Sequence, residues 1–368
     1  MYFSGDLYYK ALSLEFLDFN EAIRLYEEAP LEELMAVADA VKRRLKNDGT
    51  VTWQIDRNVN ITNVCVSGCK FCNFHCRPAE RDKAYVTGSD QYREKIAEMV
   101  RLGGDQLLLQ GGLHPRLGIE YYEELFRSLK QEFPAVRLHA LGPPEVAHLS
   151  RISGISSQEA LDRLVAAGLD SLAGAGAEIL DNEVRRRISP GKCSADRWLE
   201  IMGEAHRMGL ATSATMMYGH VEQPRHRIEH LLKIRDLQAR KPKGAPGFLA
   251  FIPWAYQGEG TVLEREGCPG GSSTAGYLRL IAVSRLVLVN VPNIQASWLT
   301  MGVPAAQMAL HGGANDMGSI MIEENVVSSA GSHNSLDAAG MQRVIREAGF
   351  VPRLRDQLYR FRDQEPVI

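Results

Sequence analysis

Three cysteines in one short run constrain this chain more than any other feature of its sequence. Cys65, Cys69 and Cys72 are spaced as C-x3-C-x2-C, so they can offer three thiolates to one inorganic centre. A cubane iron–sulfur cluster normally takes four cysteine ligands. Three ligands leave one iron with an open position, much as catalytic metal sites keep one coordination position free. The spacing therefore predicts a [4Fe–4S] cluster with an open iron.

Two other interpretations of these cysteines fit the sequence less well. One is three unrelated buried cysteines. The other is a zinc knuckle, which needs a second ligand pair at a short spacing, whereas Cys193 and Cys268 are isolated in the sequence. Cys76 lies four residues beyond Cys72 and is a possible fourth ligand. We interpret Cys76 as a non-ligand, because a fourth thiolate would occupy the open iron.

The cysteine run resembles that of the radical S-adenosylmethionine (SAM) enzymes. It shares with them the spacing and an aromatic residue, Phe71, directly before the third cysteine. In those enzymes the open iron chelates the amino and carboxylate groups of SAM. The resemblance implies that this chain binds a [4Fe–4S] cluster and SAM, with Phe71 among the cofactor-binding residues.

Composition sets wider limits on the protein. A chain of 368 residues with 45% hydrophobic content can bury a large core as one or two domains. A formal charge of −3 and a pI near 6.4 give no basic footprint for nucleic acid. The first 19 residues do not read as a signal peptide, and no stretch is long enough to span a membrane. Because a labile cluster needs a reducing compartment, we expect a cytoplasmic protein.

Strand-like and helix-like segments alternate along the chain, which predicts a parallel α/β fold. Eight strands alternating with amphipathic helices indicate a (β/α)8 TIM-type barrel over residues 51–327. Residues 1–50 are expected to form an N-terminal helical extension, and residues 328–368 a C-terminal extension packed on the barrel. The predicted strands are Trp53–Thr62, Gln106–Gln110, Arg137–Leu141, Ser171–Gly174, Ala211–Tyr218, Gly247–Trp254, Asn293–Thr300 and Gly318–Ile322.

The ends of the predicted strands carry the candidate cofactor-binding residues, as a (β/α)8 barrel requires. Gly111 and Gly112 follow the second strand. Glycine lets the backbone approach a ligand closely, and in radical SAM enzymes a Gly-Gly pair at this place holds the methionyl amine of SAM. A plain tight turn is the other interpretation, and Leu113 stands where the family commonly has an acidic residue.

Glu178 and Arg185 follow the fourth predicted strand. A carboxylate accepts two hydrogen bonds at once, so we expect Glu178 to accept from the ribose hydroxyls of SAM. The alternative is a carboxylate favoured only by a helix N-terminus. Arg185 would share the helix face of Glu178 and pair with the SAM carboxylate. A solvated basic face formed with Arg186 and Arg187 explains Arg185 equally well.

Five further runs narrow the resemblance to the menaquinone-biosynthetic radical SAM enzymes, whose relatives include the deazaflavin cofactor synthase subunits. Within that group, the Pro-Pro-Glu at 143–145 and the Phe-Ile-Pro-Trp at 251–254 look most like the enzymes that cyclise dehypoxanthine futalosine. The similarity covers nearly the whole chain, with small departures at Gly142 and at 173–175. The five runs are residues 110–115, 139–145, 176–180, 214–220 and 295–298.

This resemblance implies a cyclase that converts dehypoxanthine futalosine to its cyclic form. A low-potential donor such as flavodoxin or ferredoxin reduces the cluster, and SAM is split into methionine and a 5′-deoxyadenosyl radical. The radical abstracts the C4′ hydrogen of the ribose, and the sugar radical closes a ring onto the benzoate. Loss of an electron and a proton then restores aromaticity, which requires a general base. The candidates are His114, His220 and Glu222, unranked.

Two kinds of alternative function remain open at this point. One is a related radical SAM activity, either aminofutalosine synthase or an enzyme like the deazaflavin cofactor synthase. The other is a non-enzymatic scaffold that binds iron–sulfur or zinc. Zinc and no iron in anaerobically purified protein would favour the scaffold.

Replacing Cys65, Cys69 or Cys72 by alanine is expected to abolish cluster absorbance and 5′-deoxyadenosine formation together, because three thiolates are the minimum anchorage. Visible absorbance and product analysis of anaerobically purified variants measure both quantities. Cys76→Ala is the matched control and should keep both. Loss of the cluster in Cys76→Ala would show that the ligand set is wrong.

Overall fold

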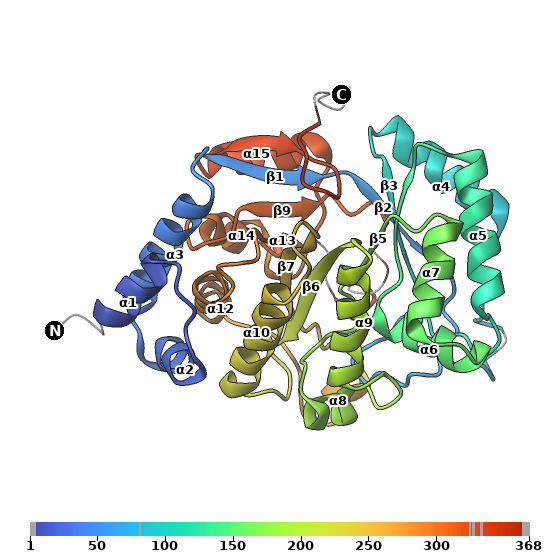
Figure 1. Ribbon diagram of the computed structural model, residues 1–368, viewed down its shortest axis with the longest axis horizontal. Coiled ribbons are helices and arrows are strands. Elements are labelled where there is room, and N and C mark those ends of the chain that lie inside the picture. Colours follow the sequence, from blue (N-terminus) through green and yellow to red (C-terminus); the bar gives the residue numbers. More distant parts are fainter. Residues whose placement is uncertain (1–4, 81, 324, 326–327, 332–333, 363–368) are drawn as a thin grey trace.

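The chain folds into a barrel of parallel strands surrounded by helices, as the computed structural model in Figure 1 shows. The structure describes residues 5–362 except 81, 324, 326, 327, 332 and 333. Within these residues, seven parallel strands form one sheet whose spatial order follows the sequence. Parallel neighbours need crossover connections, which the helices between them provide. The strands are β2 (Asp56–Asn60), β3 (Gln106–Gln110), β4 (Arg137–Ala140), β5 (Ser171–Leu172), β6 (Ala211–Tyr218), β7 (Gly247–Ala255) and β8 (Asn293–Ile294).

An eighth strand, β9 (Asp316–Ser319), fills the gap between β8 and β2. It pairs with the strand segment before β2 in a parallel ladder. It joins β8 through an isolated bridge between Gln295 and Asp316, and Ile322, just beyond β9, bridges to Arg57 of β2. The predicted eighth strand is therefore present, although its regular part begins two residues earlier than expected. The barrel closes at this seam, as the predicted (β/α)8 class requires.

The first predicted strand, Trp53–Thr62, is in fact two strands that separate at Ile55. β1 (Thr50–Gln54) leaves the main sheet and pairs with β9 on one side and with β10 (Val351–Leu354) on the other. β10 was not predicted, because its pairing partner lies some 300 residues earlier in the chain. The predicted boundary at 327 lies outside the described residues, and the division into three domains stays a prediction.

The helices begin at capping side chains that the sequence supplies. Ser156, Ser194 and Ser273 each accept a hydrogen bond from a backbone N–H in the first turn of α7, α9 and α12. No helix in the described part of the chain is both long enough and apolar enough to cross a membrane. The helices after β2 are α4 (Ser89–Arg101), α5 (Ile119–Glu132), α6 (Pro143–Ser153), α7 (Ser157–Ala167), α8 (Asn182–Ile188), α9 (Ala195–Arg207), α10 (Pro224–Ala239), α11 (Val262–Arg265), α12 (Thr274–Val287), α13 (Trp298–Met301), α14 (Val303–Leu310) and α15 (Ala338–Glu347).

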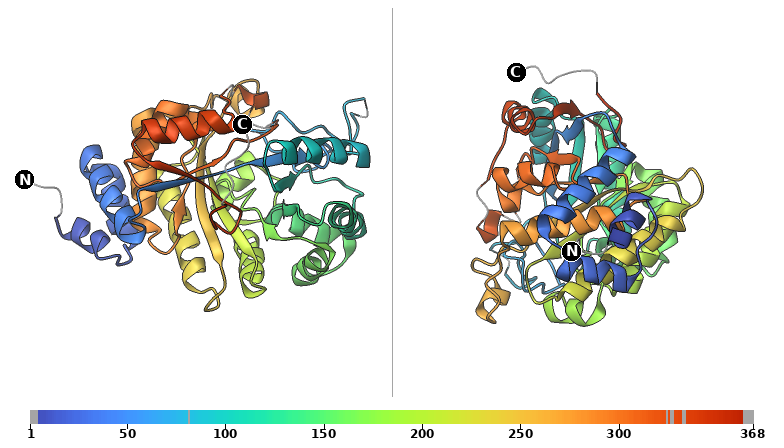
Figure 2. Two further views of the ribbon diagram at one scale, coloured as in Figure 1. Left: turned by 90° about the horizontal axis from the view of Figure 1, so that it is seen from above. Right: turned by 90° about the vertical axis from the view of Figure 1, so that its left-hand side faces the viewer.

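The N-terminal segment adds α1 (Gly5–Leu12), α2 (Phe19–Glu28) and α3 (Leu31–Leu45). Figures 1 and 2 show these helices outside α12, on the opposite side of the molecule from α4 and α5. α12 is apolar on nearly all sides because it lies between the barrel and α3. The N-terminal helices therefore leave the ends of the strands uncovered for function.

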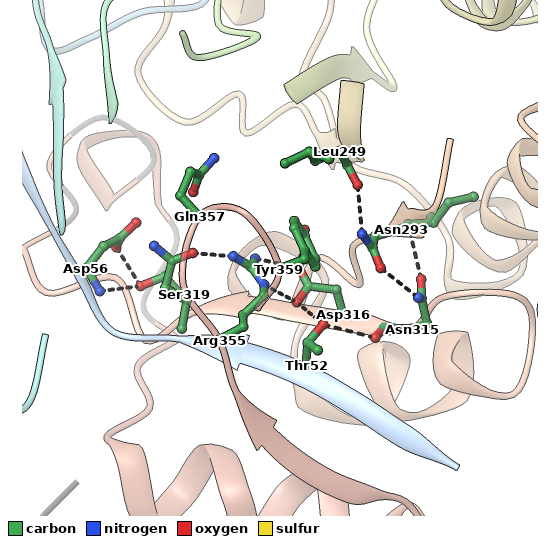
Figure 3. Close-up of polar contacts among 12 residues, drawn as sticks. Thr52, Asp56, Leu249, Asn293, Asn315, Asp316, Ser319, Arg355, Gln357 and Tyr359 are labelled. Atoms are coloured by element: carbon green, nitrogen blue, oxygen red, sulfur yellow. Dashed lines mark hydrogen bonds and ion pairs between the residues drawn. The ribbon is translucent and has the colours of Figure 1, made fainter. Parts of the chain in front are cut away.

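A buried ion pair fastens the C-terminal segment to the barrel (Figure 3). Nε and Nη2 of Arg355 lie 3.0 and 2.9 Å from the two carboxylate oxygens of Asp316. Asp316 also accepts hydrogen bonds from Thr52 Oγ1 at 2.7 Å and from the Tyr359 hydroxyl at 3.0 Å. Arg355 Nη1 donates to Gln54 Oε1. These bonds offset the cost of removing two charges from water.

Arg355→Met is expected to lower the free energy of unfolding by about 3–5 kcal/mol, because it leaves the Asp316 carboxylate buried without its cation. Urea unfolding of the variant and of the parent protein measures the difference. Arg360→Met is the control, since Arg360 pairs with Asp356 at the surface and is 63% exposed. Equal stability of the two variants would contradict the structural role of the pair.

Candidate active site

A cavity of about 370 Å³ reaches through the barrel from the cysteine loop to the C-terminal segment. Along β2 its wall is formed by Asp56, Asn58 and Asn60, the alternating inward positions of a strand. The interior of a (β/α)8 barrel is usually filled by large branched side chains. Short polar side chains here leave a hollow of the size and kind that binds small molecules.

The three predicted cluster ligands lie together at one end of this cavity. Cys65, Cys69 and Cys72 all contribute to its wall. The hydroxyl oxygen of Ser67 lies 2.9 Å from the sulfur of Cys65 and 3.3 Å from that of Cys69. The backbone N–H of Leu113 donates to the Cys65 sulfur at 3.2 Å. The loop thus gathers the sulfurs and supplies hydrogen-bond donors around them.

This donor set fits an iron–sulfur cluster. Burial raises the pKa of the Cys69 thiol to about 11, while nearby Lys192 acts in the opposite direction. Metal coordination removes the thiol proton outright, so the cluster would supply the charge that stabilises these thiolates. Within the described residues, no three His, Cys, Asp or Glu side chains converge on one metal-ion position. A cubane does not need such convergence, because each cysteine binds a different iron.

The backbone groups of Cys76 form hydrogen bonds within the same loop. Its N–H donates to the Asn63 carbonyl, and its carbonyl accepts from the Cys65 N–H. Its side chain is buried, and in the part of the chain that the structure describes it does not belong to the cavity wall. This placement separates Cys76 from the other three cysteines of the loop.

Gly111 and Gly112 line the cavity and also bring β3 against the cysteine loop. A Cβ atom on Gly112 would lie 2.2 Å from the Val64 carbonyl oxygen and 2.9 Å from the Cβ of Cys65. Only glycine therefore allows this approach of two backbone segments. The two glycines therefore have a packing role in addition to any contact with SAM.

Glu178 points into the cavity beside a lysine that the sequence analysis missed. Its side chain is 3% exposed, and its φ of +44° is a backbone strain that accumulates at functional sites. Lys192 Nζ lies 2.5 Å from Glu178 Oε1 and 5.2 Å from the centre of the Phe71 ring. Although burial lowers the pKa of Lys192, Cys69 and Glu178 outweigh it and keep the ammonium charged.

Arg185 is placed differently from the sequence-based expectation. Its guanidinium donates to the backbone carbonyls of Gly176, Ala177 and Cys193 at 2.6–3.0 Å. It is 3% exposed, so it belongs to no solvated basic face. Among the described residues it does not line the cavity. It holds in place the loop that carries Glu178.

The three candidate bases also lie away from the cavity wall formed by the described residues. His114 Nδ1 accepts backbone N–H groups from two residues of its own turn, both at 3.2 Å. His220 Nδ1 lies 3.1 Å from Glu222 Oε2, and both side chains are fully buried. Arg227 donates to Glu222 from the other side. These contacts stabilise turns, and the role of base stays a prediction for all three.

Glu145 is an acid–base group of the cavity wall that the sequence analysis did not propose as a base. It lies in the first turn of α6, directly after the two prolines noted in the sequence. Burial raises the pKa of its carboxyl to about 7, with Lys192 opposing the shift. In the sequence, the Pro-Pro-Glu run indicated only the family resemblance. A single glutamate forms no spacing pattern that would predict an acid–base role.

Comparison with protein families gives two matches that together span most of the chain. Residues 59–234 match the model of the radical SAM superfamily, which includes the cysteine loop, Gly111, Gly112 and Glu178. Residues 245–368 match the CofH/MqnC C-terminal region. This second region contains β9, β10 and Arg355.

Comparison with individual proteins supports the same family assignment. The chain is 48% identical over 343 residues to a cyclic dehypoxanthine futalosine synthase of Streptomyces coelicolor, covering 92% of this chain and 84% of that protein. It is 38% identical to a 5-amino-6-(D-ribitylamino)uracil--L-tyrosine 4-hydroxyphenyl transferase of Archaeoglobus fulgidus, covering 90% and 94% of the two chains. The crystal structure of methylornithine synthase shares the fold, with a TM-score of 0.72 at 20% identity over 95% of this chain and 98% of the other. With the cysteine loop, these matches show that the chain is a radical SAM enzyme and belongs to the branch of that family that carries the CofH/MqnC C-terminal region.

Proposed function

We propose that this enzyme converts dehypoxanthine futalosine to cyclic dehypoxanthine futalosine in menaquinone biosynthesis. The observation that carries the proposal is the continuous cavity with the three cysteines at one end and a polar-lined barrel beyond them. The 48% identity to a cyclic dehypoxanthine futalosine synthase supports the choice of substrate. A reaction of this kind needs SAM and its substrate side by side in one closed space.

The chemistry that a [4Fe–4S] cluster and SAM supply when bound is the reductive cleavage of SAM to methionine and a 5′-deoxyadenosyl radical. Cys65, Cys69 and Cys72 are the proposed ligands of that cluster. The backbone at Gly111 and Gly112 is proposed to face the methionyl amine, and Phe71 to pack beside the cofactor. Other groups of the chain orient SAM and exclude water from it.

Glu178 and Lys192, which form an ion pair, are proposed to bind different groups of SAM. Glu178 presents a buried carboxylate to the ribose hydroxyls, as expected from the sequence. Lys192 is the cation that lines the cavity beside Glu178, so we assign to it the contact with the SAM carboxylate expected earlier of Arg185. Arg185 is proposed to act as a positioning residue, because its guanidinium donates to backbone carbonyls of the loop before Glu178.

Abstraction of hydrogen at ribose C4′ and closure onto the benzoate are proposed as in the related cyclases. Restoring the aromatic ring then releases one electron and one proton; the electron would pass to the oxidised cluster, and the proton requires a base near the substrate. We propose Glu145 for this step, since it faces the cavity and its pKa of about 7 lets it exist in both protonation states near neutral pH. A flavodoxin or ferredoxin of low potential is the proposed electron donor, and the cytoplasm the proposed compartment.

The second candidate function is that of the archaeal transferases, which are 38% identical to this chain. Aminofutalosine synthase is a third. Purified enzyme incubated anaerobically with dithionite, SAM and each candidate substrate separates these functions by product mass. The proposal predicts a product two mass units lighter than dehypoxanthine futalosine. Turnover of another substrate in its place would contradict it.

Glu178→Ala is expected to weaken SAM binding by about 1.5–3 kcal/mol for each charged hydrogen bond lost. Equilibrium binding of SAM to the cluster-loaded enzyme measures the change. Glu183→Ala, at an exposed position of α8, is the control and should bind SAM normally. Unchanged affinity in Glu178→Ala would return Glu178 to a purely structural role.

Glu145→Gln is expected to uncouple the two products, because a base for the last step is not needed to cleave SAM. The ratio of cyclised product to 5′-deoxyadenosine should fall by up to ~10²–10⁴-fold if proton transfer limits the rate. His114→Gln and His220→Gln test the candidates from the sequence in the same assay and should keep the ratio. Uncoupling in one of these, with none in Glu145→Gln, would move the base to that histidine.

A further inference from the structure

We propose that the end of the cavity opposite the cysteines is a recognition site for uncharged hydroxyl groups of a sugar, built from Gln54, Asn58 and Gln106. The three amide side chains line the cavity and are 2%, 4% and 1% exposed. Each has one polar atom that finds no hydrogen-bond partner among the described residues. Buried polar atoms left without partners are rare, so each points to a missing ligand group or water.

The orientation of the Gln54 amide follows from its neighbour. Arg355 has only donors, and its Nη1 contacts Gln54 Oε1. The amide oxygen of Gln54 is therefore already used as an acceptor. Its atom without a partner is Nε2, which carries two N–H donors.

Gln106 contacts the C-terminal segment through its amide nitrogen. Its Nε2 donates to Gln357 Oε1 at 3.1 Å, and Gln357 Nε2 lies 3.5 Å from His139 Nε2. Burial lowers the pKa of His139 to about 4, and its Nδ1 lies 2.8 Å from Ser171 Oγ. The atom of Gln106 without a partner is its acceptor, Oε1.

The polar atoms without hydrogen-bond partners are thus a donor on Gln54 and acceptors on Gln106 and Asn58. A hydroxyl group is matched to such a set, because it donates and accepts at the same time. Adjacent hydroxyls of a furanose meet several of these atoms at once. A bound water fills the same role until the sugar displaces it.

The charges at this end argue against an anionic group. Arg355 is engaged by Asp316 through two hydrogen bonds, and Figure 3 shows both beside Tyr359 and Thr52. Asp56 lies on the other side, bonded to Ser319 Oγ. Among the described residues at this end of the cavity, no cationic side chain is without an anionic partner. A carboxylate or phosphate would therefore meet no compensating charge. The proposed ligand is therefore a neutral polyol.

The inference rests on the proposed function only for the identity of the whole substrate, in which this group would be the ribose. Gln106 pairs with Asp56, four residues before Asn60 on β2, so it lies roughly 13 Å along the strand from the end that leads into the cysteine loop. Asn58 lies roughly 7 Å from that end, so the site extends from the middle of the strand away from the cysteines.

Binding to the oxidised, SAM-bound enzyme, which does not turn over, tests the inference. Dehypoxanthine futalosine and its 2′-deoxy and 3′-deoxy analogues are titrated into the parent protein, Gln54→Glu, Gln106→Leu and the exposed control Gln131→Leu. Gln54→Glu keeps the contact with Arg355 but exchanges a donor for an acceptor. Each cavity variant should lose about tenfold in affinity for the full sugar, and much less for the analogue that lacks the contacted hydroxyl.

Methyl β-D-ribofuranoside and benzoate serve as fragments that do not depend on the proposed substrate. Saturation-transfer NMR should detect the riboside on the parent protein and on Gln131→Leu, and lose it on Gln54→Glu. Benzoate should be unaffected by that change. If the riboside behaves so while dehypoxanthine futalosine does not bind, the proposed function fails and this site stands. If both cavity variants bind every sugar as the parent does, the site is overturned even where the cyclisation is confirmed.

Discussion

A buried ion pair between Arg355 and Asp316 ties the C-terminal segment to the strand that closes the barrel. β9 pairs with β1 in a parallel ladder and reaches β8 and β2 through isolated bridges and single backbone hydrogen bonds. Arg355 comes from the C-terminal segment and Asp316 from β9, while Thr52 and Gln54 of β1 bond to the same pair. Three distant segments of the chain are thereby joined at one point.

This closure leaves the interior hollow and gives it two chemically different ends. At one end, the loop after β2 collects three sulfurs, and Gly112 lets β3 pack against it. At the other, amide side chains and the C-terminal segment form a neutral floor. Glu178, Lys192 and Glu145 are ionisable groups on the wall where SAM is proposed to bind. A radical formed between the two ends would be shielded from water by the barrel itself.

The sequence predicted those features that depend on local spacing. Cys65, Cys69 and Cys72 were found because their intervals are distinctive, and β3 and β7 because continuous apolar runs mark buried parallel strands. β10 and Arg355 were missed, since their partners lie far away in the chain and leave no periodic pattern near them. Lys192 was missed for a similar reason, and Arg185 was assigned to SAM because backbone carbonyls are invisible to a sequence pattern.

Three thiolates are proposed to leave one iron of the cluster open to SAM. Electron–nuclear double resonance of the reduced enzyme detects this bond when SAM is labelled by ¹⁵N in the amino group and ¹⁷O in the carboxylate. We expect hyperfine coupling of both labels to the cluster, in the parent protein and equally in Cys76→Ala. A spectrum without these couplings, or one in which SAM binds the cluster only after Cys76 is removed, would contradict it.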